Sequence, residues 1–247
     1  MQSTASLKRV LGRLDALFLG FGAMIGWGWI ILSGVAVEEA GVGGATLAFV
    51  LGSAVILVIG FAYAELASAL PFAGGEHAYT QRAFGGAVSF VATWSIIFGY
   101  VSVVAFEAIA LPVAVAYLVP EFKLWPLWEV AGYRVHGSEA ALGAATAFVI
   151  TILNILGVRL AVRVQTAALV LIFIAGGALI LGGAVNIAAP KETLQMWNGA
   201  SGLMAAIIIV PFLFVGFDVI PQSAEEIDTP RRDIGRALIG SIAMAIV

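Results

Sequence analysis

Long uncharged intervals alternate along the chain with short segments that carry its charged side chains. The six long intervals are residues 16–37, 40–64, 83–106, 140–158, 164–190 and 193–217. Each is long enough for the roughly 20 residues that a helix needs to cross a bilayer. The third continues past Glu107 to Pro120, which predicts a long helix with one acid inside it. A seventh interval, 237–247, breaks off within an apolar run, as expected of a chain cut in mid-helix.

Spans of this length and polarity are predicted to be helices. Backbone groups inside a bilayer have to pair with one another, and a helix satisfies them within one segment. A membrane barrel would show ten-residue stretches of alternating polarity, which are absent here. The expected fold class is therefore an all-α polytopic membrane protein, with residues 1–247 forming one transmembrane domain.

Composition excludes most soluble classes. Hydrophobic residues make up 62% of the chain and charged residues 11%, whereas roughly 25% of residues in a soluble domain are charged. A soluble enzyme, a nucleic-acid-binding protein and a disordered chain are thereby excluded, and the lipid bilayer becomes an expected partner. With no cysteine and two histidines, no metal site, disulfide or cofactor is expected. No paired acids or metal ligands share a span at helical spacing, so we expect no enzyme.

The basic residues indicate the orientation. If the spans alternate from a cytoplasmic N-terminus, nine of the 12 Lys and Arg side chains lie inside and three, Lys123, Arg134 and Lys191, lie outside. Positive charge collects on the cytoplasmic side of membrane proteins, so we expect a multi-pass plasma-membrane protein with its N-terminus in the cytoplasm. The alternative, a cleaved signal peptide over residues 1–37, requires a shorter apolar stretch with less glycine and tryptophan.

Two of the intervals contain helix-breaking residues. The first reads GFGAMIGWG at residues 20–28, and the span that begins with the sixth interval continues past residue 217, reading PFLFVGFDVIPQSAEEI at residues 211–227 with Asp218 near its centre. Glycine density alone favours close helix packing through Gly22 and Gly26, and the spacing is wrong for a nucleotide loop. In the sixth span, however, prolines remove backbone donors and an acid lies at bilayer depth.

The positions of these breaks predict an inverted repeat. The first and sixth spans are five steps apart, so they enter the membrane from opposite sides. Interrupted helices at corresponding positions of two oppositely oriented halves are typical of transporters with a binding site at the bilayer midplane. We expect a first five-helix repeat over about 14–190 and the start of a second over about 200–247.

Four segments also resemble one known family. GAMIGWGWIILSG (22–34), YAELASALPFAGGEHAYTQRAFG (63–85), NILGVRLAVRVQ (154–165) and FVGFDVIPQSAEEIDTPRRDIGRA (214–237) are similar, in this order, to motifs of the amino acid–polyamine–organocation permeases. The resemblance implies a 5+5 inverted-repeat fold with helices 1 and 6 interrupted. The family has ten to fourteen helices, so the chain would end within helix 7 and hold about half of a transporter.

The breaks also predict the substrate site. Free N–H groups at the start of the outer half-helix suit a carboxylate, and free carbonyls at the end of the inner half suit an ammonium. The carboxylate position is expected at Ile25, Gly26, Trp27 and Gly28, and the ammonium position at Gly22, Ala23 and Met24. The resemblance implies a matching role for Phe214, Val215 and Gly216. Phe212 falls where the family often has an aromatic lid, although ordinary packing explains it equally well.

The chain departs from the family at two tryptophans. The family usually has a small or hydroxyl residue at the position of Trp27 and an aliphatic one at the position of Trp29. Either Trp27 turns away from the pocket or it reshapes the carboxylate position.

Two acids remain inside the spans. An acid near the bilayer centre costs roughly 2.5–3.5 kcal/mol to insert, so a functional role is the default for Asp218. We interpret Asp218 as the group that binds a coupling proton, with helix capping as the alternative. For Glu107, a contact with the substrate ammonium and a structural hydrogen bond are both open.

The predicted function is secondary active transport of an amino acid or related amine by alternating access, coupled to H⁺ or by exchange. A channel on the same fold and a non-transporting membrane sensor or assembly subunit are the alternatives. A channel usually shows a repeated filter segment or a ring of like charge, and neither is present. The substrate, the coupling ion and the oligomeric state are left open by the sequence.

Overall fold

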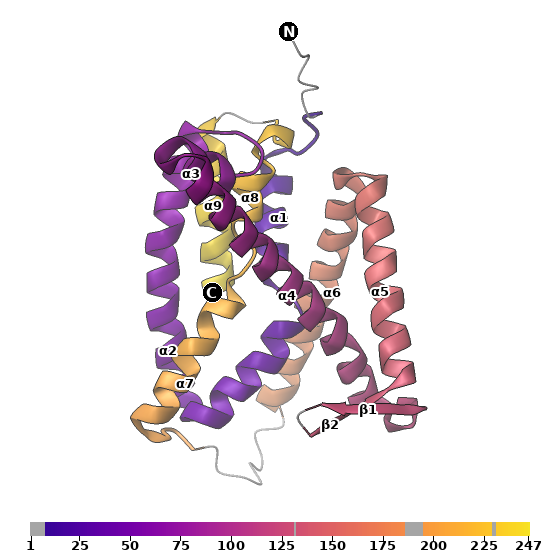
Figure 1. Cartoon of the computed structure of the whole chain (residues 1–247). Coiled ribbons are helices and arrows are strands. Elements are labelled where there is room, and N and C mark those ends of the chain that lie inside the picture. Colours follow the sequence, from indigo (N-terminus) through magenta and orange to yellow (C-terminus); the bar gives the residue numbers. More distant parts are fainter. Residues whose placement is uncertain (1–7, 131, 186–194, 229–230) are drawn as a thin grey trace.

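The computed structural model describes residues 8–130, 132–185, 195–228 and 231–247. Nearly all of this part is helical, with one short hairpin (Figure 1). Its elements, in chain order, are α1 (Arg13–Met24), α2 (Trp27–Ala69), α3 (Glu76–Phe84), α4 (Gly86–Leu118), β1 (Pro126–Val130), β2 (Tyr133–His136), α5 (Gly137–Leu156), α6 (Val158–Val185), α7 (Gly199–Leu213), α8 (Val219–Gln222) and α9 (Arg231–Ile246).

Within the described residues, four helices are long and apolar enough to cross a membrane: Gly28–Ala69, Gly86–Ala116, Gly137–Leu156 and Val158–Ala178. This confirms an all-α polytopic membrane fold. The uncharged intervals predicted six spans, and the difference has two causes. The first and sixth intervals are each interrupted, and the outer part of the first continues into the second as one kinked element, α2. The expected boundary between the two repeats falls partly on residues 186–194, outside the described residues.

The kink in α2 lies at Gly41, where φ is +75°. A Cβ atom there would lie 2.7 Å from the carbonyl oxygen of Gln195, so a side chain has no room. Asn198, just before α7, donates its backbone N–H to the Ala40 carbonyl (3.1 Å) and its side-chain amide to the Glu38 carbonyl (2.9 Å). The start of α7 is therefore anchored on the turn between the first two intervals.

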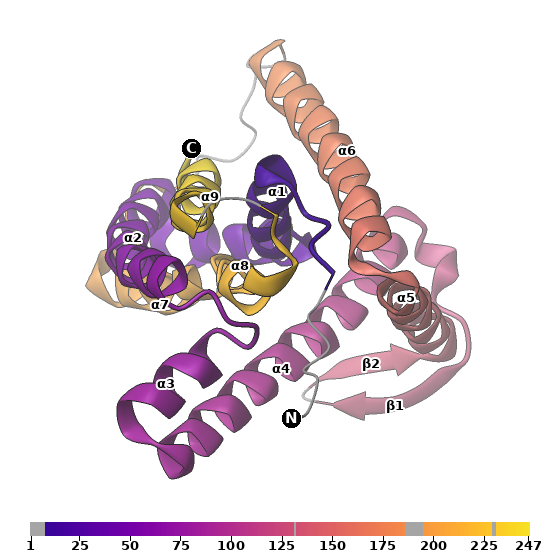
Figure 2. The same cartoon turned by 90° about the horizontal axis from the view of Figure 1, so that it is seen from above.

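Most of the helices pack closely into one group, and the α5–α6 pair lies to one side of it (Figure 2). α2 packs along α7 and α9, and α1 packs against α9 and α6. Figure 2 shows α1, α2, α7, α8 and α9 gathered together, with the α5–α6 pair to one side and α4 running across from α3 to the hairpin. The buried apolar core lies within the tight group, with Phe21, Phe214, Ile220 and Ile242 at most 2% exposed.

Main-chain bonds hold one end of the protein together. Leu11 and Ile227 form a parallel bridge, in which the Leu11 N–H donates to the Glu226 carbonyl (3.0 Å) and the Asp228 N–H donates to the Leu11 carbonyl (2.8 Å). The Arg159 guanidinium donates to the Val10 carbonyl at 3.2 Å. The structure thus brings together three segments that the charge pattern predicted to share one side of the membrane.

The opposite end carries the β1–β2 hairpin, which the sequence interpretation did not predict (Figure 1). Its short, exposed strands resemble a charged loop in composition, and Gly132 turns the chain with φ +83°. The Tyr133 hydroxyl donates to Glu139 Oε1 (2.8 Å), and Glu139 Oε2 accepts the His136 N–H (3.0 Å), which caps the start of α5. Partial burial, the hydrogen bond to Glu139 and the charge of that carboxylate together raise the pKa of Tyr133 to about 12.

Candidate substrate site at two broken helices

The first break separates α1 from α2 at two extended residues. α1 ends at Met24, and Ile25 (φ −91°, ψ 109°) and Gly26 (φ −144°, ψ −169°) carry the chain into α2. A helix end leaves its last carbonyls and first N–H groups without helical partners. At this break the Ile25 N–H still donates to the Phe21 carbonyl and the Trp29 N–H to the Gly26 carbonyl, both at 3.1 Å, which leaves the carbonyls after Phe21 and the N–H groups before Trp29 without such partners. This is the interruption that the glycine-rich motif predicts.

The second break follows Pro211. α7 ends at Leu213, a turn occupies residues 214–218, and the short helix α8 begins at Val219. Within the turn, Gly216 has φ +119°, a conformation that L side chains rarely adopt.

The two breaks are in direct contact. A Cβ atom on Gly216 would lie 2.6 Å from the carbonyl oxygen of Ala23, at the end of α1. Trp29, in the first turn of α2, donates its indole N–H to the Leu213 carbonyl at 2.8 Å. Phe214 is fully buried, and its ring packs against those of Trp29 and Phe49 with centroid distances of 6.0 and 5.6 Å.

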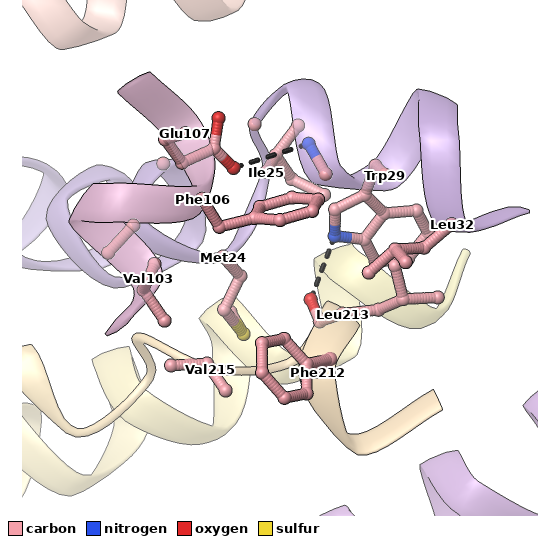
Figure 3. A pocket seen from close by; sticks show the side chains of 14 residues that line it. Met24, Ile25, Trp29, Leu32, Val103, Phe106, Glu107, Phe212, Leu213 and Val215 are labelled. Carbon is pink, nitrogen blue, oxygen red and sulfur yellow. Dashed lines mark hydrogen bonds between the residues drawn. The ribbon is translucent and has the colours of Figure 1, made fainter. Parts of the chain in front are cut away.

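Glu107 reaches the first break from α4. Its Oε1 accepts the Gly28 N–H at 3.2 Å (Figure 3). A Cβ atom on Gly26 would lie 3.0 Å from the same oxygen, and one on Gly28 would lie 3.2 Å away. The glycines therefore let the carboxylate approach the backbone, and Gly28 presents a bonded rather than a free N–H.

A cavity of about 180 Å³ lies where the two breaks and α4 meet. Figure 3 shows Glu107 and Phe212 on opposite sides of it, with Met24 and Phe106 between them. Fourteen residues line the cavity: Gly22, Ala23, Met24, Ile25, Gly26, Gly28, Trp29, Leu32, Val103, Phe106, Glu107, Phe212, Leu213 and Val215. Most of the predicted site residues are therefore neighbours in space.

Two of the residues predicted to bind substrate, Phe214 and Gly216, do not line this cavity. Phe214 points into the core, and Gly216 contacts the end of α1. Trp27 begins α2, but its side chain lies outside the described part of the chain. Trp29, Val103 and Phe106, by contrast, line the cavity although the sequence interpretation did not assign them to the site.

Asp218 lies in a second polar cluster just beyond the break. The side-chain amide of Gln222 donates to Asp218 Oδ2 at 3.1 Å and to Glu76 Oε2 at 3.3 Å, and it lies 3.4 Å from the Tyr100 hydroxyl. Glu76 is only 7% exposed, and its second oxygen has no hydrogen-bond partner among the described residues. The sequence interpretation missed Glu76 and gave Gln222 no special role.

In the described part of the chain, no three His, Cys, Asp or Glu side chains stand close enough together to hold a metal ion. The polar atoms at the breaks are main-chain groups and one carboxylate, which suit a small charged organic molecule.

Comparison with known proteins identifies the family of this chain. Residues 15–247 match the family described as amino acid permease. The chain is 30% identical to the branched-chain amino acid permease BcaP of Bacillus subtilis, over 98% of this chain and 53% of that protein. It is 30% identical to the chloroplastic cationic amino acid transporter 9 of Arabidopsis thaliana, over 98% and 44% of the two chains.

A third relative is the aspartate-proton symporter of Bacillus subtilis, which is 26% identical over 100% of this chain and 47% of the symporter. The chain thus spans about half the length of the relatives that it matches. All three are transporters rather than enzymes, in keeping with the sequence interpretation.

Proposed function

Since the chain belongs to the amino acid permease family, we propose that it binds and carries an amino acid or a related amine across the membrane. The observation that carries this proposal is the cavity at the meeting point of the two broken helices. Broken helices place partial charges inside a bilayer without ionisable side chains, which is how secondary transporters hold charged substrates. The transport mode is alternating access, in which the paired breaks move together.

The residues of the cavity take the following roles in this proposal. The last carbonyls of α1, at Gly22, Ala23 and Met24, accept hydrogen bonds from the substrate ammonium. The apolar side chains around them contact the rest of the substrate. Phe212 is 53% exposed at the edge of the cavity, which suits the predicted lid.

Asp218 is proposed to bind the coupling proton, together with Glu76. Both carboxylates accept hydrogen bonds from the same Gln222 amide, so they repel each other when both are charged. A proton held between them removes that repulsion. The similarity to a relative named as a proton symporter supports proton coupling in this chain.

We also propose a plasma-membrane location with a cytoplasmic N-terminus, and the basic residues support this orientation. Lys8 and Arg13 flank Leu11 in the chain and the Arg159 guanidinium donates to Val10, so these three lie at the end with the Leu11–Ile227 bridge. Arg134 lies in β2 and Lys123 just before β1, at the hairpin end. Positive charge marks the cytoplasmic side.

Counterflow tests the proposal. The protein is purified from cells and reconstituted into liposomes that are loaded with an unlabelled amino acid or amine. Uptake of the same compound in labelled form is then measured. Saturable, trans-stimulated uptake supports transport. Uptake without saturation would identify a channel, and binding without uptake would identify a sensor or assembly subunit.

A further inference from the structure

The position that a broken helix offers to a substrate carboxylate is already filled in this protein. Glu107 Oε1 accepts the Gly28 N–H at 3.2 Å, at the positive end of α2. Gly26 and Gly28 leave room for this carboxylate, since a Cβ on either would lie 3.0 or 3.2 Å from Glu107 Oε1 and the carboxylate would have to shift. The protein thus supplies its own anion where an α-amino acid would place one.

The other polar groups of the cavity also favour a cation. The carbonyl end of α1 carries a partial negative charge, and among the residues that line the cavity Glu107 is the ionisable one. The carbonyl of Leu213 at the end of α7 is bonded to the Trp29 indole. A substrate carboxylate would therefore meet a carboxylate and helix carbonyls, without a basic side chain from this lining to balance it.

The size and lining of the cavity limit the size and polarity of the rest of the ligand. Its volume of about 180 Å³ is small beside the roughly 300–1,000 Å³ of sites for drug-sized ligands. Leu32, Val103, Phe106, Phe212 and Val215 give it an apolar wall. The space fits a small ammonium with one apolar substituent.

We infer that this site prefers a primary amine that lacks an α-carboxylate over the amino acid with the same side chain. Glu107 is the counter-ion of the amine, and it excludes the amino acid by occupying the α2 N-terminus. This inference rests on the proposed function and specifies its substrate class.

Matched pairs test the inference directly. Binding of leucine and 3-methylbutylamine, phenylalanine and 2-phenylethylamine, and lysine and cadaverine is measured calorimetrically on the purified protein at neutral pH. Within each pair the compounds differ by the carboxyl group alone. We expect the amine to bind about tenfold tighter or more in at least one apolar pair, as a hydrogen-bonded charge pair implies.

A charge-neutral variant then identifies the cause. In Glu107→Gln the amide oxygen still accepts the Gly28 N–H, so the cap on α2 is kept while the negative charge is lost. We expect the amine-to-amino-acid affinity ratio to fall about tenfold or more. Glu121→Gln removes an exposed carboxylate in the short turn after α4, outside the cavity, and leaves the ratio unchanged.

The outcomes separate the inference from the proposed function. Tighter binding of the amino acids, or the same ratio in Glu107→Gln, overturns the inference and leaves amino acid transport intact. Binding of none of the six compounds by folded protein contradicts both. If Glu107→Gln fails to fold, the wild-type pairs still decide, since tighter binding of the amino acids there is sufficient to reject the inference.

Discussion

The indole N–H of Trp29 bonds to the carbonyl oxygen of Leu213 at 2.8 Å, although 184 residues separate them in the chain. The bond joins the first turn of α2 to the last residue of α7, and thus one broken helix to the other. Trp29 is one of the two tryptophans at which the sequence departs from the family pattern. Trp29 therefore supplies a hydrogen-bond donor for the Leu213 carbonyl, which the second break leaves without a helical partner.

Trp29→Phe is expected to destabilise the protein by about 1 kcal/mol, because the Leu213 carbonyl loses its donor while the aromatic packing is kept. Thermal unfolding in detergent measures the effect. Trp94→Phe is the matched control, since Trp94 is 57% exposed on α4, and its effect should stay within about 0.5 kcal/mol. Equal stabilities of the two variants would show that the indole bond contributes nothing.

Gly216→Ala is expected to destabilise the protein by more than about 1 kcal/mol. Its φ of +119° strains any L residue, and the new methyl group would lie 2.6 Å from the Ala23 carbonyl. Gly176→Ala in α6 provides the comparison, because nothing lies within 4 Å of its Cβ position and alanine favours a helix. Unfolding temperatures should therefore fall for the first variant and hold or rise for the second.

Asp218→Asn is expected to abolish the stimulation of uptake by an inward proton gradient while leaving exchange without a gradient. The amide cannot bind the proton that the carboxylate pair holds. Glu76→Gln should weaken the same stimulation, since it removes the other acid that Gln222 contacts.

Vesicle uptake of a labelled substrate, with and without an imposed gradient, measures this effect. Asp228→Asn, an exposed acid at the same end of the protein, should behave as the wild type. An unchanged response to the gradient in Asp218→Asn would remove Asp218 from the coupling mechanism.

Tyr133 is expected to titrate with a pKa of about 12, whereas a tyrosine in an unfolded chain titrates near 10. Since folding raises this pKa, the stability that Tyr133 contributes is complete below about pH 10 and is lost as the pH rises through about 12. The absorbance titration at 295 nm of wild type minus Tyr133→Phe isolates this group. A difference curve centred near pH 10 would contradict the hydrogen bond to Glu139.

The sequence predicts the two breaks well because their causes are local. Glycines weaken a helix and a proline removes a backbone donor, so the signal for a break lies in the same few residues as the break itself. The role of Glu107 cannot be predicted from local sequence. Its contact with Gly28 spans 79 residues and depends on the path of α4 across the protein. A charge inside an apolar span signals importance, but it does not indicate its partner.

The contact between Glu76 and Gln222 could not be predicted for the same reason, because it depends on residues far apart in the chain. Glu76 belongs to a short, polar helix outside the uncharged intervals, so its sequence resembles that of a solvated loop. The buried position arises from the return of the chain at Gly74, whose N–H donates to the Gln222 carbonyl at 3.2 Å. The nearby glycine pair is the local signal of that tight return.

Because of the bridge between Leu11 and Ile227, this end of the protein should tolerate side-chain substitutions better than insertions or deletions. Residues 10 and 11 take part in these bonds through their main-chain atoms, including the Val10 carbonyl that accepts from the Arg159 guanidinium. Many side chains could therefore replace Val10 without touching them. An inserted or deleted residue between Leu11 and the start of α1 would instead shift the register, and would pull the first helix along its axis relative to the segment after the second break.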